Sequence, residues 1–196
     1  MVKDKCHLIE EYEANPFTMM IMPIKYESNT YSKIVEFEDE LISPLKPIDI
    51  IKKSCEYFGS SFEGRREGTR QLIDITHKAP ITIDPTNSIY FFPTTSPSRL
   101  QCIWISHEHV LSHKRAGAGS TLVTFRNKQI YTLPISYASF GNQLQRAALL
   151  QTKLMQRLEE TERRFQYLWW SARLMKVSPK GSLYEQDAHF RRNPFE

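Results

Sequence analysis

Three arginines and three glycines share the segment from residue 59 to residue 70: Arg65, Arg66, Arg70, Gly59, Gly64 and Gly68. Arginine offers a planar charged fork that suits phosphate groups and narrow grooves, and glycine lets the backbone come close to a ligand. The glycines predict a loop-like segment, and we expect its arginines to reach the negative potential of a DNA minor groove. In the alternative interpretation, Glu63 and Glu67 pair with these arginines on a solvated loop.

More basic residues lie downstream of this segment: Lys78, Arg99, Lys114, Arg115, Arg126 and Lys128. Lys78 and Arg99 stand beside proline turns, where each is a candidate contact to a DNA phosphate. The other four flank a predicted hairpin, where they would either widen a positive surface or serve only for solvation. Residues 1–50 carry 5 basic and 10 acidic residues, a net charge of −5, whereas residues 51–196 carry 21 and 12, a net charge of +9. This asymmetry favours a polyanionic partner.

The histidines in the middle of the chain raise the question of a metal site. His107 and His109 are two residues apart on a predicted strand, so both side chains would project from one face. With His113 and Cys102 they could bind zinc, but no second ligand pair follows at the spacing of a structural site. We therefore prefer histidines that form local hydrogen bonds or face solvent. The sequence also has no nucleotide-binding glycine motif and no hydrolase serine motif, so we expect no metal, no cofactor and no enzymatic activity.

The order of the predicted elements indicates an α+β fold. Residues 18–25 and 31–38 are short β-prone stretches that form a hairpin, and Pro47 opens a helix that runs through Tyr57. Runs of β-branched and aromatic residues then predict strands at residues 81–83, 89–92, 102–109, 121–125 and 129–133, the last two joined by a tight turn at Asn127 and Lys128. We expect a twisted antiparallel sheet or a small barrel, with the short helix before it.

A long helical segment follows, from Ser139 to about Lys176. Its residues fit a heptad repeat, with one seam position at Leu144, Gln151, Leu158, Phe165 and Ala172 and the other at Ala147, Leu154, Thr161, Leu168 and Met175. Such a stripe commonly packs on its own domain, but about 38 residues of helix span roughly 57 Å, which exceeds the width of a small domain. We therefore weigh packing within one chain against self-association through Leu144, Leu154, Leu158, Phe165, Leu168 and Trp169. Because Trp169 and Trp170 are adjacent, they face different directions, one as a packing anchor and the other exposed or in contact with a partner.

These features divide the chain into four parts: an acidic hairpin segment packed on the core at 1–46, an α+β DNA-binding core at 47–137, a helical oligomerisation segment at 138–177 and a flexible tail at 178–196. The sequence has no apolar run of about 18 residues and no secretory signal, so we expect neither a membrane span nor export. Three cysteines without a C-x-x-C motif are typical of a reduced cytosolic protein.

Several uncommon blocks of residues occur together and in order: Ser54-Cys55, Phe58-Gly59-Ser60-Ser61, Gly64-Arg65, Gly68-Thr69, Thr76-His77-Lys78-x-Pro80-Ile81, Asp84-Pro85, Phe92-Pro93-Thr94, Gln101-Cys102-x-Trp104-Ile105-Ser106-His107-x-His109-Val110, Leu133-Pro134-Ile135-Ser136-Tyr137, Ser139-Phe140 and Asn142-Gln143. On these blocks, residues 47–157 resemble the competence transcription factor family (ComK) of Gram-positive bacteria. Residues 1–46 resemble that family loosely, and the sequence departs from it past about residue 160.

The resemblance implies a transcriptional activator of DNA-uptake and recombination genes, located in the cytoplasm and associated with the nucleoid. It implies double-stranded DNA as a partner, bound at paired A/T-rich boxes mainly through the minor groove by a dimer or tetramer. RNA polymerase and an adaptor that delivers the protein to a Clp protease are further implied partners. Two alternatives stay open: a divergent paralogue that acts only as a protein–protein interaction module, and a metal-dependent enzyme that uses the three histidines.

Overall fold

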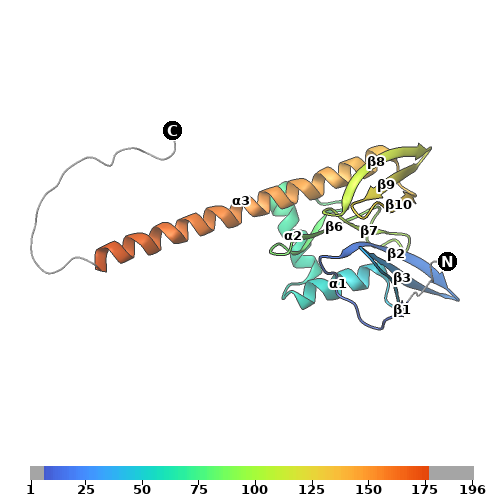
Figure 1. The fold of residues 1–196 in the computed structure, drawn as a ribbon, viewed down its shortest axis with the longest axis horizontal. Coiled ribbons are helices and arrows are strands. Elements are labelled where there is room, and N and C mark those ends of the chain that lie inside the picture. Colours follow the sequence, from blue (N-terminus) through green and yellow to red (C-terminus); the bar gives the residue numbers. More distant parts are fainter. Residues whose placement is uncertain (1–6, 177–196) are drawn as a thin grey trace, which may run out of the picture. The chain divides into compact units, whose positions relative to one another are not determined.

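Two β-sheets and three helices form the part of the chain that the computed structural model describes, which is residues 7–176 without the side chains of residues 172 and 174–176. The larger sheet contains, in spatial order, β1 (His7–Leu8), β4 (Glu40–Ser43), β3 (Asn29–Glu36), β2 (Thr18–Tyr26), β7 (Trp104–Ser106), β6 (Ile89–Pro93) and β5 (Ile81–Asp84). The smaller sheet contains β10 (Ile130–Leu133), β9 (Ser120–Phe125) and β8 (Val110–Gly117). The helices are α1 (Pro47–Tyr57), α2 (Phe62–Ile73) and α3 (Tyr137–Lys176). The α+β prediction is confirmed, with two sheets in place of one sheet or a barrel (Figure 1).

The larger sheet is buried on both faces because its central strands carry apolar residues at consecutive positions. Side chains alternate between the two faces of a strand, so neighbours such as Phe91 and Phe92 enter different cores. Phe91 lies in the first core cluster with side chains of α1 and α2, and Phe92 lies in the second with side chains of the smaller sheet and of α3. Trp104 and Ile105 on β7 divide in the same way. The sheet is therefore the middle layer of the fold, with α1 and α2 on one side and the smaller sheet and the start of α3 on the other (Figure 1).

The helix predicted at residues 47–57 is confirmed by α1. Pro47 occupies the first helical turn, where its missing N–H costs no intrahelical hydrogen bond. Ile50, Ile51 and Cys55 are fully buried and fix the helix on the sheet. The two predicted hairpins are also confirmed: β2 pairs with β3, and β9 pairs with β10 across a turn in which Lys128 adopts a φ of 71°.

The prediction of a loop at residues 59–70 is wrong, because residues 62–73 form α2. The Ser61 hydroxyl accepts a hydrogen bond of 3.0 Å from the Gly64 backbone N–H and caps the helix. Phe62 and Thr69 are buried, and the Thr69 hydroxyl donates to the Pro80 carbonyl at 2.9 Å. Each glycine inside a helix costs about 1 kcal/mol relative to alanine, and here the cap and the buried contacts outweigh that cost.

The sequence also misplaces the strands around residues 102–117. The predicted strand at 102–109 is shortened to β7, so His107 and His109 lie in a turn beyond its end and do not share a strand face. The following strand, β8, is absent from the prediction. Most of its residues are exposed, and its sequence VLSHKRAG therefore shows no alternation of apolar and polar positions.

The long helix predicted from Ser139 to Lys176 is confirmed by α3, which begins two residues earlier at Tyr137. The chain divides into two units, residues 1–157 and residues 158–196. Within the first unit, Phe140, Ala147 and Leu150 bury one face of α3. Among the described residues, no helix combines the length and the apolar character needed to span a membrane. The tail predicted at 178–196 lies outside the described residues.

Replacing Ser61 with alanine should lower the free energy of unfolding by about 1 kcal/mol, because the N-terminal donors of α2 lose their side-chain acceptor. Urea denaturation followed by circular dichroism would measure the change. Ser60→Ala is the matched control, since its hydroxyl makes no hydrogen bond among those recorded for the described residues. An equal loss in both variants would contradict the capping role.

Candidate nucleic-acid interface

The first turns of α3 hold the turn that carries Lys78 in place through a buried glutamine. The Gln143 side-chain amide donates hydrogen bonds to the carbonyl of Lys78 at 2.8 Å and to that of Pro93 at 2.9 Å. Arg146 adds a bond of 3.0 Å to the Gln143 side-chain oxygen and one of 3.3 Å to the His77 carbonyl. The turn that carries Lys78 is therefore tied to α3 and to the end of β6.

Lys78 itself is exposed and adopts a left-handed backbone conformation, with a φ of 51°. A non-glycine residue rarely adopts this conformation unless the surroundings enforce it. The hydrogen bond from Gln143 to the Lys78 carbonyl holds the backbone in this conformation. Among the described residues, Lys78 has no acidic partner within ion-pair distance. The contact of Lys78 with a DNA phosphate stays a prediction.

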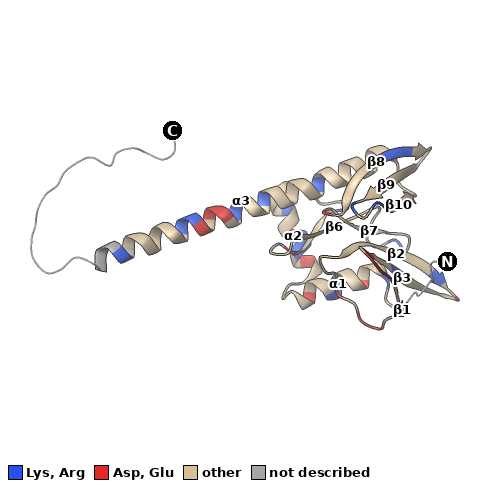
Figure 2. Ribbon diagram, in the orientation of Figure 1, with Lys and Arg blue, Asp and Glu red and all other residues tan. Residues whose placement is uncertain are grey.

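The β8–β9 hairpin, residues 110–125, forms the second basic surface, and we call it the basic hairpin. β8 is an edge strand of the smaller sheet, and the turn into β9 contains Gly117 and Gly119, both at positive φ. Lys114 and Arg115 are exposed near this turn, opposite Leu122 and Thr121 on β9 (Figure 2). Since successive residues of a strand point to opposite faces, the two cations lie on both faces of one narrow ribbon.

His113 connects the basic hairpin to the start of α3. Its ring centroid lies 5.0 Å from that of Tyr137 and 5.1 Å from that of Phe140. Phe140 is fully buried and belongs to the second core cluster. The hairpin is therefore anchored by one aromatic cluster just before its cations, which fixes where Lys114 and Arg115 stand.

The three arginines of α2 have different environments. Arg65 is half-buried, and its Nη2 donates a hydrogen bond of 3.1 Å to the Ile83 carbonyl at β5, so this side chain is turned toward the sheet. Arg70 is paired with Glu67, and hydrogen bonding from Arg70 lowers the pKa of that carboxyl group to about 2. Arg66 is exposed and forms no ion pair within the described part of the chain. The structure thus brings Arg66 and Arg99 to one cavity and separates both from the basic hairpin.

The histidines predicted as alternative metal ligands do not form a cluster. Among the described residues there is no group of three or more histidine, cysteine, aspartate or glutamate side chains placed to hold a metal ion. The His109 ring forms a hydrogen bond with the Pro16 carbonyl at 2.8 Å, and burial lowers the pKa of His109. Burial also raises the pKa of Cys55 and of Cys102 to about 11, so both thiols are protonated at neutral pH.

The predicted oligomerisation residues fall into two groups along α3. Leu144 packs against the second core cluster, and Leu154 is half-buried beside α2. Leu158, Phe165, Leu168 and Trp169 belong to the second unit and are exposed, with Phe165 at 67% of its full area. Trp170 is exposed too, so neither tryptophan is covered by another described residue to the extent that a packing anchor requires.

Sequence reasoning missed the residues that support these surfaces. Gln143 and Arg146 lie on a helix face that also carries buried Ala147. A glutamine on an otherwise apolar helix face is the sequence signal that could have identified this anchor. The sequence identifies His113 only as a candidate metal ligand. Its neighbours Tyr137 and Phe140 come from α3, and no sequence spacing links them to β8.

This arrangement defines the class of protein: an α+β protein that exposes cations on a hairpin anchored to its core. A family model described as ComK protein matches residues 9–159, and the chain belongs to this family. The competence transcription factor of Bacillus subtilis (strain 168) is 44% identical over 151 residues, covering 77% of this chain and 79% of the relative. No solved structure gives a significant match. The family match reaches further toward the amino terminus than the resemblance at residues 47–157 indicated.

Replacing Arg65 with glutamine should destabilise the fold by about 1–3 kcal/mol, because the Ile83 carbonyl loses a charge-assisted hydrogen bond. Arg66→Gln removes the same charge from the next position, which is exposed, and should change the stability by no more than about 0.5 kcal/mol. Chemical denaturation of both variants measures the difference. Equal stability of the two proteins would show that Arg65 is not a structural residue.

Proposed function

We propose that this chain is a transcriptional activator of competence genes that binds DNA at paired A/T-rich boxes, mainly through the minor groove. The observation that carries the proposal is the basic hairpin, in a chain 44% identical to a protein named competence transcription factor. Lys114 and Arg115 lie on opposite faces of this hairpin, and the phosphates of the two DNA strands line the two sides of a groove. One hairpin can therefore contact both strands.

The shape of the minor groove explains why such a hairpin would select A/T-rich sequences. The minor groove presents nearly the same hydrogen-bonding groups for A·T and T·A pairs, so it distinguishes little beyond A·T from G·C. A/T-rich tracts have a narrow minor groove with enhanced negative potential, which attracts arginine and lysine. Arg115 supplies the guanidinium, and Lys78 and Lys114 supply phosphate contacts.

Because minor-groove binding reads little sequence, specificity would come from the spacing of two boxes and would require more than one subunit. The exposed residues of α3 support a contact between copies of this chain: Leu158, Phe165, Leu168 and Trp169. Three of them occupy heptad seam positions, at which helices of two subunits interlock. We also propose a cytoplasmic, nucleoid-associated location and contact with RNA polymerase. The expected docking of a Clp-protease adaptor on the tail lies outside the described residues.

The double substitution Lys114→Gln and Arg115→Gln should weaken binding to an A/T-box duplex by about 1–3 kcal/mol and lower the salt dependence, because two phosphate-neutralising charges are lost. Fluorescence anisotropy at two salt concentrations measures both effects. Lys25→Gln is the control, since it removes an exposed charge from the tip of the β2–β3 hairpin. Unchanged affinity in the double variant would exclude the basic hairpin from the interface.

Phe165→Ala should weaken self-association about tenfold or more, because an exposed aromatic residue on the heptad seam would be buried between subunits. Tyr167→Ala is the matched control: Tyr167 is an aromatic residue of similar exposure on the same helix but lies off the seam. Sedimentation equilibrium measures the association constants. If both substitutions weaken association equally, or neither does, the heptad seam is not the contact between subunits.

A further inference from the structure

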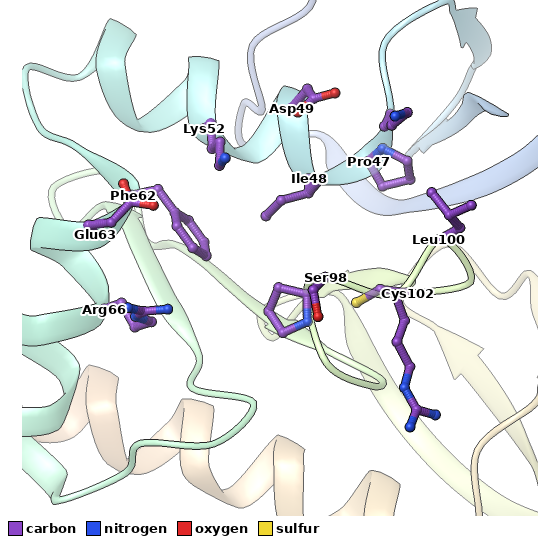
Figure 3. A pocket seen from close by; sticks show the side chains of 13 residues that line it. Pro47, Ile48, Asp49, Lys52, Phe62, Glu63, Arg66, Ser98, Leu100 and Cys102 are labelled. Atoms are coloured by element: carbon purple, nitrogen blue, oxygen red, sulfur yellow. The ribbon is translucent and has the colours of Figure 1, made fainter. Parts of the chain in front are cut away.

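A cavity of about 350 Å³ lies between the first turns of α1 and α2 and the loop at residues 97–102, and we call it the α1–α2 pocket. Its volume falls in the range of small-molecule sites. Lys52 on α1 and Arg66 on α2 point into it from two different helices, with the ring of Phe62 between them and the side chain of Ile48 on the other side of Lys52 (Figure 3). The pocket thus combines cationic groups with apolar walls.

The α1–α2 pocket carries an excess of positive charge. Lys46, Lys52, Arg66 and Arg99 contribute four cations to its lining, and Asp49 and Glu63 contribute two carboxylates. Within the described part of the chain, none of these six residues forms an ion pair. The Asp49 carboxylate is directed away from the hollow, as Figure 3 shows. A concave site with this excess of cations attracts an anion.

The apolar walls distinguish the α1–α2 pocket from a simple phosphate contact. Phe62 is buried, and its ring packs edge-on against Trp104 with centroids 6.1 Å apart, so the wall it forms is rigid. Leu100 leaves 60% of its area exposed at the opposite wall. A DNA phosphate would use the cations and leave these apolar surfaces uncovered. A small molecule that carries both phosphate and a flat apolar group would use both.

We propose that the α1–α2 pocket binds a small phosphorylated molecule of the nucleoside phosphate class, with its phosphates between Lys52 and Arg66 and its base against Phe62 and Leu100. The lining of the pocket also includes the buried residue Cys102. None of its lining residues belongs to the basic hairpin, so binding of this ligand does not depend on DNA binding.

Isothermal titration of the full chain without DNA tests the proposal with three probes: ADP, pyrophosphate and adenosine. We expect ADP to bind, and the double substitution Lys52→Gln and Arg66→Gln to weaken ADP and pyrophosphate about tenfold or more, because each charge-assisted hydrogen bond is worth at least that factor. Leu100→Ala should weaken ADP severalfold and leave pyrophosphate unchanged, since it removes only an apolar contact.

The matched control is Lys53→Gln with Arg70→Gln, which removes one charge from each of the same two helices at positions outside the pocket, where Glu11 and Glu67 are the partners. Its ADP affinity should equal that of the unmodified chain, and thermal melts of both double variants confirm folding. The proposal is overturned if ADP does not bind at millimolar concentration or if the control loses as much affinity. It is likewise overturned if the Lys52 and Arg66 substitutions reduce only duplex binding, which would make these residues a DNA contact.

Discussion

Burial of the seven-stranded sheet on both faces is the constraint on which the rest of the structure depends. Consecutive apolar residues on β6 and β7 supply two cores at once, so neither layer of the fold can be removed without exposing the sheet. The first core holds α1 and α2 and thereby forms the α1–α2 pocket. The second holds the smaller sheet and the start of α3, and thereby positions the basic hairpin. Each of the two proposed binding surfaces is supported by a different face of one sheet.

The start of α3 converts this packing into a defined arrangement of cations. Phe140 enters the second core and contacts His113, whereas Gln143 bonds the turn that carries Lys78. A buried glutamine with two carbonyl acceptors is costly to leave unsatisfied, so the helix has one register in which it fits. The Lys78 turn and the basic hairpin are therefore both attached to the core through α3. The proposed recognition of groove width depends on a fixed spacing between cations.

Much of this fold could be predicted because its signals are local. Pro47, the turn at Asn127 and Lys128, and the apolar runs of β5, β6 and β9 each specify an element from neighbouring residues. The glycines predict a loop at 59–70, whereas Ser61 caps a helix there and Phe62 is held by burial against Trp104 from β7. β8 gives no such signal because most of its residues are exposed. The inward orientation of Arg65 depends on a carbonyl 18 residues away, which no local pattern reveals.

We propose that this chain recognises A/T-rich DNA through the minor groove. The most direct test of this proposal is the affinity of the chain for a duplex in which inosine replaces guanine. An inosine–cytosine pair lacks the guanine 2-amino group, so it presents the minor groove of an A·T pair and the major groove of a G·C pair. Anisotropy titrations would compare three duplexes with two boxes each, built from A·T, G·C or inosine–cytosine pairs. We expect the inosine duplex to bind nearly as tightly as the A/T duplex. Binding as weak as that of the G·C duplex would contradict minor-groove recognition.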